Sequence, residues 1–140
     1  MTTRLLCALL LCLSTLASYT PAQTEVPDTP AGRVLTAWLA AFNSGDIVQM
    51  RAFDQRYRRD GGPPAPPPEV TIDFRARTGG FTVIRIEKSE PTSITALLQE
   101  RDSDSIGRAE LSVTTDDPPK IAAIGIRPTP RPTDLALPRM

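Results

Sequence analysis

The strongest constraint on the fold is a series of four short runs rich in β-branched residues in the second half of the chain. They span residues 81–87, 93–101, 106–115 and 121–127, and only brief breaks with proline or polar residues separate them. β-branched side chains favour extended backbone, and short breaks of this composition suit hairpins. The sequence therefore predicts four strands that form an antiparallel meander.

Alternation along these runs predicts which face of the sheet is buried. Successive side chains of a strand point to opposite faces. The apolar set expected on the face toward the helices is Ile84, Ile86, Ile94, Ala96, Leu98, Ala109, Leu111, Val113, Ala122, Ile124 and Ile126. The charged set expected on the opposite face is Arg85, Glu87, Arg108, Glu110, Lys120 and Arg127. One face of the sheet should pack on helices and the other should meet solvent.

Residues 30–57 have the pattern of a helical hairpin. The first helix is predicted from a Thr29-Pro30 start and from apolar residues at spacings of three and four. Those residues are Val34, Leu35, Trp38, Leu39, Ala41 and Phe42. Gly45 is suited to a left-handed cap, and Asp46 to the cap of a second helix. The apolar positions expected in the second helix are Val48, Met50, Phe53 and Tyr57.

The segment between the hairpin and the strands is a proline-rich loop followed by an ambiguous stretch. Consecutive prolines at residues 63–68 predict an extended loop. Residues 69–77 hold β-branched residues that favour a strand, but Val70 and Phe74 stand at helical spacing and two glycines follow as a helix stop. We favour a short third helix here. Helices first and an antiparallel sheet afterwards define an α+β fold.

Residues 1–22 have the pattern of a cleavable secretory signal. Arg4 precedes an apolar run that ends well short of the roughly 20 residues that a bilayer-spanning helix needs. Small residues favour cleavage before Gln23, and cleavage after Ala17 is the alternative. We therefore expect a periplasmic or secreted protein. The remaining chain divides into a flexible lead-in at residues 23–29, a domain at 30–127 and a Pro-rich tail at 128–140.

The residue types that remain after cleavage exclude several kinds of chemistry. The chain has no histidine, and its two cysteines, Cys7 and Cys12, lie inside the signal. Each cysteine follows two leucines, so neither has the small preceding residue of a lipoprotein signal. A Ser-His-Asp or Cys-His arrangement, a disulfide and an ordinary zinc or copper site are thus excluded, and we expect no cofactor. The two lysines, Lys88 and Lys120, have no serine three residues before them, so a Ser-x-x-Lys nucleophile is excluded too.

Charge gives no reason to expect nucleic acid or an acidic membrane as a partner. The 16 Lys and Arg residues balance 16 Asp and Glu residues. Binding to a polyanion depends on an excess of positive charge, which this chain lacks.

Residues 37–46, Ala-Trp-Leu-Ala-Ala-Phe-Asn-Ser-Gly-Asp, resemble the opening helix and turn of the NTF2-like (SnoaL-like, cystatin-like cone) superfamily. The segments 77–81, 100–104, 121–126 and 131–136 are similar to an accessory domain of bacterial exported hydrolases, where it precedes a serine β-lactamase-like or S41-peptidase-like catalytic domain. The resemblance covers about residues 30–136.

This resemblance implies a cone-shaped α+β fold with an apolar pocket between helices and sheet. It also implies a stand-alone or truncated accessory module, which would bind a protein partner or a small apolar ligand. A homodimer through the outer sheet face is a further implication.

Six aromatic residues are the candidates for the walls of such a pocket: Trp38, Phe42, Phe53, Tyr57, Phe74 and Phe81. The simpler interpretation, which we favour, is that they form the core of a small domain. We expect a module without catalytic residues. The alternative is an isomerase or hydrolase of the SnoaL-like kind, in which Asp54 or Asp73 points into the pocket and acts as a base.

Overall fold

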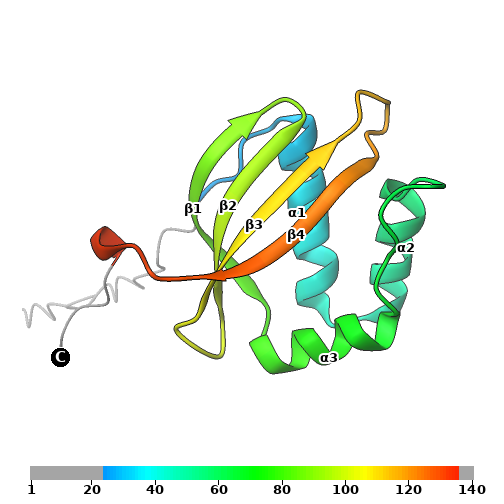
Figure 1. Ribbon diagram of the computed structural model, residues 1–140. Coiled ribbons are helices and arrows are strands. Elements are labelled where there is room, and N and C mark those ends of the chain that lie inside the picture. The colour runs from blue at the N-terminus through cyan, green and yellow to red at the C-terminus, as the bar shows by residue number, and fades with distance from the viewer. Residues whose placement is uncertain (1–23, 136–140) are drawn as a thin grey trace, which may run out of the picture.

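The computed structural model describes residues 24–135 (Figure 1). The expected signal peptide and the end of the tail lie outside these residues. The elements in chain order are α1 (Pro30–Ser44), α2 (Ile47–Tyr57), α3 (Pro68–Thr78), β1 (Phe81–Glu90), β2 (Ser93–Glu100), β3 (Ile106–Val113), β4 (Ile121–Thr129) and a 3-10 turn, η1 (Thr133–Leu135). Three helices followed by four antiparallel strands confirm the predicted α+β fold.

Local capping explains where the helices begin and end. Thr29 accepts a hydrogen bond from the Gly32 amide at 3.0 Å and starts α1, while Gly45 ends it at φ 66°. Asp46 then caps α2 by accepting from the Val48 amide at 2.8 Å. The ambiguous stretch before the strands is the helix α3, which Gly79 ends at φ 70°. Side-chain oxygens at helix starts and left-handed glycines at helix ends satisfy backbone groups that the helix leaves unpaired.

The four strands form one open antiparallel sheet in the order β1-β2-β3-β4. Helix α1 packs across β1, β2 and β3. Helix α2 stands beyond β4, and α3 runs along the bottom of the view below α1 and α2 (Figure 1). The core between α1 and the sheet holds Leu35, Phe42, Ile94, Ala96 and Leu98, each at most 2% exposed. Burial of one sheet face against helices is the layered arrangement that the alternation predicted.

The core face of β1 differs from the predicted one. Phe81 and Val83 are buried and Ile86 packs against the core, whereas Ile84 does not belong to the core cluster. The register of β1 against β2 shifts between Val83 and Arg85 and again between Ile86 and Lys88. A bulge adds a residue to one strand and reverses its alternation, so the inward set changes from odd to even positions.

Three further side chains lie elsewhere than predicted. Ala122 was expected on the core face of β4, but Ile121 takes that place at 1% exposure, because the register of β3 against β4 shifts between Ser112 and Val113. Val48 was expected on the apolar side of the second helix, but it is 67% exposed because it occupies the outer side of the first turn of α2. Lys120 was expected on the solvent face of the sheet, yet its amine donates to the Arg56 carbonyl at the end of α2. Lys120 therefore ties the start of β4 to the helical side.

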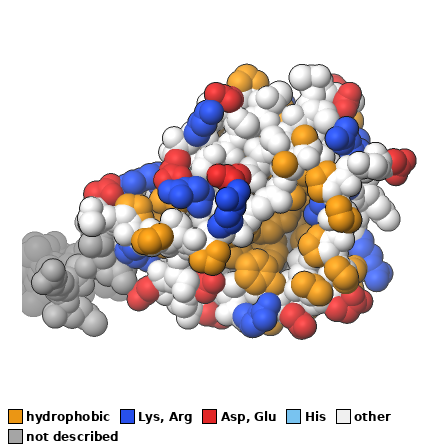
Figure 2. All heavy atoms as spheres, viewed as in Figure 1, with side chains coloured by type: hydrophobic (Ala, Val, Ile, Leu, Met, Phe, Trp, Pro, Cys, Tyr) orange, Lys and Arg blue, Asp and Glu red, His pale blue; other side chains and the backbone are white. Residues whose placement is uncertain are grey.

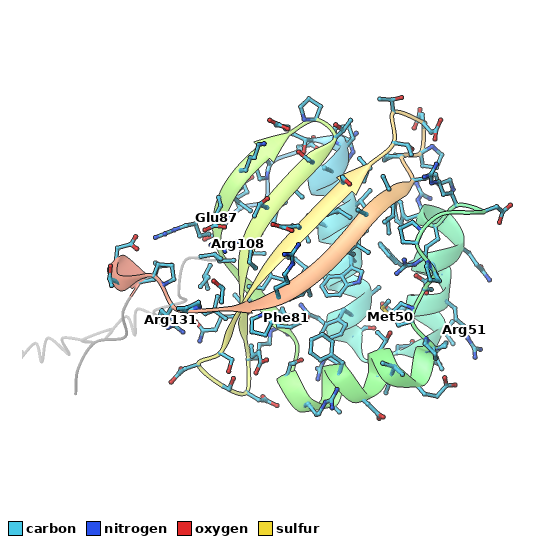
Figure 3. All side chains as sticks on the ribbon, viewed as in Figure 1. Met50, Arg51, Phe81, Glu87, Arg108 and Arg131 are labelled. Atoms are coloured by element: carbon cyan, nitrogen blue, oxygen red, sulfur yellow. The ribbon has the colours of Figure 1, made fainter. Side chains whose placement is uncertain are left out.

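The outer face of the sheet, which points away from the helices, carries three ion pairs that join different elements. Arg108 contacts Glu87 through two hydrogen bonds of 2.6 and 3.1 Å, and Figure 3 shows the two side chains side by side. Arg127 pairs with Glu110 at 3.0 Å. The third pair, between Arg85 on β1 and Asp134 in η1, joins the tail to the far edge of the sheet.

Beneath these pairs the outer face holds two buried apolar residues. Leu97 is 0% exposed and Ile106 is 5% exposed, and neither belongs to the core cluster. Leu97 stands opposite Arg85 on one side and Arg108 on the other. The chain after β4 stays close to this surface, because Arg131 donates to the Asp104 carbonyl at 3.0 Å. The outer face is thus partly covered by its own ion pairs and tail.

Candidate ligand cavity

A cavity of about 210 Å³ lies where the three helices meet β4. Hydrophobic side chains gather around it, between β4 and the pair α2 and α3 (Figure 2). Its walls consist of Trp38, Phe42, Met50, Asp54, Arg58, Pro66, Thr71, Phe74, Ile124, Gly125 and Ile126. Helix α1 makes its main contacts with β1, β2 and β3. The space between the helices and β4 is therefore less completely filled, and the cavity lies there.

Stacked aromatic rings form the wall that α1 and α3 contribute. The rings of Trp38 and Phe42 lie 4.9 Å apart between centroids and only 14° from parallel. Phe74 meets Phe42 edge to face at 5.5 Å. Aromatic pairs in these geometries hold each other in place, so the side chains of this wall are well fixed.

The other predicted aromatic candidates do not line the cavity. Phe81 is 2% exposed and stacks behind the wall, 5.3 Å from Phe42. Phe53 is 5% exposed and contacts Tyr57 at 5.0 Å on α2. The structure therefore brings Trp38, Phe42 and Phe74 to the cavity and places Phe53, Tyr57 and Phe81 in the packing around it.

An ion pair on α2 forms the polar part of the cavity wall. Arg58 Nε donates to Asp54 Oδ1 at 2.8 Å, and the two side chains are 13% and 24% exposed. Residues four apart on a helix are neighbours, which explains the pairing. Arg58 Nη1 also donates to the Pro63 carbonyl at 3.2 Å. Arg58 thereby fixes the proline-rich loop, whose Pro66 is part of the cavity wall.

The second carboxylate that the sequence suggested lies elsewhere. Asp73 is exposed on α3 and borders a separate groove together with Asp46 and Glu69. Only Asp54 of the two suggested carboxylates belongs to the cavity wall. Its arginine partner prevents it from being an isolated buried charge.

Several wall residues were not among the candidates from the sequence. Arg58 was missed, although its i,i+4 spacing from Asp54 was a readable signal. Thr71 and Pro66 gave no signal, because their place in the wall depends on the path of the loop. Met50, Ile124 and Ile126 were expected as apolar packing positions, and Figure 3 shows Met50 on the inner side of α2.

The wall of the cavity is apolar apart from Thr71 and the Asp54–Arg58 pair. Within residues 24–135 there is no cluster of three His, Cys, Asp or Glu side chains that could hold a metal. The helices in the same range are also too short or too polar to cross a bilayer. The cavity thus offers apolar side chains together with one ion pair.

Comparison of the chain with models of protein families, with curated proteins and with solved structures gave no significant match.

Proposed function

We propose that this protein is an exported, non-catalytic module of the NTF2-like cone kind that binds a small, mostly apolar ligand. The cavity between the aromatic wall and β4 is the observation that carries the proposal. Ligand sites are typically concave and apolar, with a few polar groups that orient the ligand. The wall residues Trp38, Phe74 and Ile124 with the Asp54–Arg58 pair have this composition.

The size of the cavity limits the ligand. Pockets for drug-sized molecules measure roughly 300–1,000 Å³, and this cavity measures about 210 Å³. We therefore propose a ligand with about one aromatic ring or an aliphatic body of similar size. This volume favours a small molecule over a protein partner at this site.

The alternative function is an isomerase or hydrolase that uses Asp54 as its base. Its location in the cavity wall is the observation in favour of this alternative. A carboxylate that acts as a general base needs an oxygen free to reach the substrate. Asp54 instead has Arg58 at 2.8 Å and is still 24% exposed. Binding is therefore the better supported function, and an NMR spectrum of a bound ligand that stays unchanged over days would separate binding from turnover.

Export and an accessory role for a hydrolase belong to the same proposal. The N-terminal pattern supports export, and the similarity to accessory domains supports the role. Expression of the whole chain in a bacterium should yield a periplasmic product that begins at Gln23, as measured by intact mass. A product that keeps Met1 in the cytoplasm would contradict export.

The binding proposal is tested with one-ring aromatic fragments and two matched variants on α3. Thr71→Trp places an indole in the cavity wall, whereas Val70→Trp places it at the neighbouring position, which is 52% exposed and outside the wall. We expect fragments to shift the NMR signals of Trp38 and Phe74 in the natural chain. Thr71→Trp should weaken binding about tenfold or more, and Val70→Trp should leave it unchanged. Equal binding by both variants would show that the cavity is not the site.

A further inference from the structure

The Asp54–Arg58 pair leaves polar groups unused at the edge of the cavity. Arg58 uses Nε toward Asp54 and Nη1 toward the carbonyls of Pro63 and Pro64. Within the described residues, Arg58 Nη2 and Asp54 Oδ2 take part in no hydrogen bond. A guanidinium has five N–H donors and a carboxylate has about four acceptor positions. The pair therefore still offers a donor and an acceptor from two residues of the cavity wall.

The net charge of the pair restricts which ligand groups fit. The two side chains are largely shielded from water, at 13% and 24% exposure, and their charges compensate each other. A ligand carboxylate would be attracted by Arg58 but repelled by Asp54. A ligand ammonium would be attracted by Asp54 but repelled by Arg58. Charges that come out of water without a matching partner are penalised. A neutral group with one donor and one acceptor meets both needs.

The aromatic wall restricts the rest of the ligand. Trp38 and Phe42 lie nearly parallel, and Phe74 closes the same side edge-on. An aromatic ring packs well against such side chains, either offset or edge to face. The aromatic residues and the ion pair line the same small cavity, so we expect a single ring with one polar substituent to contact both.

We propose that the ligand of this cavity carries a neutral amide edge, as in a primary carboxamide or a lactam, on a small flat apolar body. The amide carbonyl accepts from Arg58 Nη2 and the amide N–H donates to Asp54 Oδ2. This inference rests on the proposed function, because it names the ligand class of the same cavity. It adds a specific polar recognition element that the apolar wall alone does not supply.

The test uses four fragments with the same ring: benzamide, benzoate, benzylamine and toluene. Each is titrated into the protein lacking residues 1–22, and the dissociation constant is measured by NMR. We expect benzamide to bind about tenfold more tightly than each of the other three, because hydrogen bonds to charged groups are stronger than neutral ones. Equal affinity for benzamide and toluene would overturn the amide inference while the binding function stands. Absence of binding by all four fragments would overturn both.

Asp54→Asn provides a test with a reversed outcome. Asparagine replaces one of the two carboxylate oxygens with an NH2 donor and removes the negative charge that compensates Arg58. Benzoate should therefore become the preferred fragment. Glu110→Gln breaks the outer-face pair with Arg127 and should keep the preference for benzamide. These comparisons are ratios between fragments on one sample, so a partly unfolded variant cannot imitate the reversal. An Asp54→Asn variant that still prefers benzamide would overturn the inference.

Discussion

Asn43 takes the place of a neighbouring strand at the start of β1. Its Oδ1 accepts from the Phe81 amide at 2.8 Å, and its Nδ2 donates to the Phe81 carbonyl at 2.9 Å. Arg75 on α3 donates to the backbone carbonyl of Asn43 at 3.0 Å. One residue at the end of α1 thus joins two other elements beside the aromatic wall. A buried backbone group that loses its partner costs about 1–3 kcal/mol, so this position should matter for stability.

We expect Asn43→Ala to lower the free energy of unfolding by about 2–3 kcal/mol, because both Phe81 groups lose their partner. Asn43→Asp should also destabilise, since a carboxylate cannot donate to the carbonyl. Urea unfolding followed by tryptophan fluorescence measures both effects. Gln49→Ala, at an exposed position of α2, serves as the control and should change stability by less than about 0.5 kcal/mol. A loss of that small size at Asn43 would show that water replaces its bonds.

At the scale of elements, the turn from α3 to β1 depends on Gly79. Its φ of 70° is in the left-handed region, and a Cβ there would lie 2.2 Å from Asp102 Oδ1. The β2–β3 hairpin packs against the same turn, because the Asp102 amide donates a hydrogen bond to the Thr78 carbonyl at 3.1 Å. Gly79 therefore serves both the end of a helix and the docking of a hairpin.

We expect Gly79→Ala to destabilise the protein by about 2 kcal/mol, from left-handed strain and from displacement of Asp102. Gly61 supplies a matched control, since its φ is 71° and no atom would lie within 4 Å of its Cβ. Gly61→Ala should show the strain alone, about 1 kcal/mol. The difference between the two variants, measured by urea unfolding, reports the contact with Asp102. If the two losses are equal, the hairpin does not constrain Gly79.

The sequence predicted the elements well because their signals are local. A helix start such as Thr29-Pro30 and a helix stop such as Gly79 depend only on residues a few positions away. The core face of β1 was predicted wrongly at Ile84 because a bulge depends on the register with β2, which no local pattern encodes. The burial of Leu97 on the outer face was not predicted for a related reason, since the residues that shield it from solvent belong to other strands and the tail.

The cavity was less predictable than the elements. Hydrophobicity marks Phe42, Phe74 and Phe81 alike, but only the relative placement of α3 and the sheet decides which of them faces the cavity. Arg58 belongs to the wall because the proline-rich loop returns to it, and loop paths are not set by composition alone. Residue type thus indicates which kinds of side chain can line a cavity, whereas tertiary packing decides which of them do.

At the scale of the whole molecule, the sheet separates two buried apolar regions of unequal size. The large one lies between α1 and the sheet, and the small one comprises Leu97 and Ile106 on the outer face. The ion pairs Arg108–Glu87 and Arg85–Asp134 flank the small region. The first joins β3 to β1, and the second connects the tail to β1. Stability of the outer face should therefore depend on the charge state of these carboxylates.

The hydrogen bond from Arg108 holds the pKa of Glu87 below its ordinary value of 4.5, and the one from Arg85 holds the pKa of Asp134 below 3.8. Because these pKa values are lowered in the folded state, their stabilising contribution is complete above the ordinary values and is lost as pH falls through the lowered ones. We expect Glu87→Gln to be less stable than the natural chain at pH 6.5, with the difference closing toward pH 3. Salt at about 1 M should also narrow it, since exposed pairs are screened.

Arg108→Gln tests whether the partner is the cause of this pH dependence. It should lose a similar amount of stability at pH 6.5, and the double variant should lose less than the sum of the two single variants, because they break one interaction. Thermal unfolding at pH 6.5, 4.5 and 3 measures all four chains. Additive losses, or a Glu87→Gln difference that persists at pH 3, would mean that the pair does not stabilise the outer face. Since Leu97 lies beside Arg108 in the register, a confirmed coupling would show that this ion pair helps to keep the second apolar region closed.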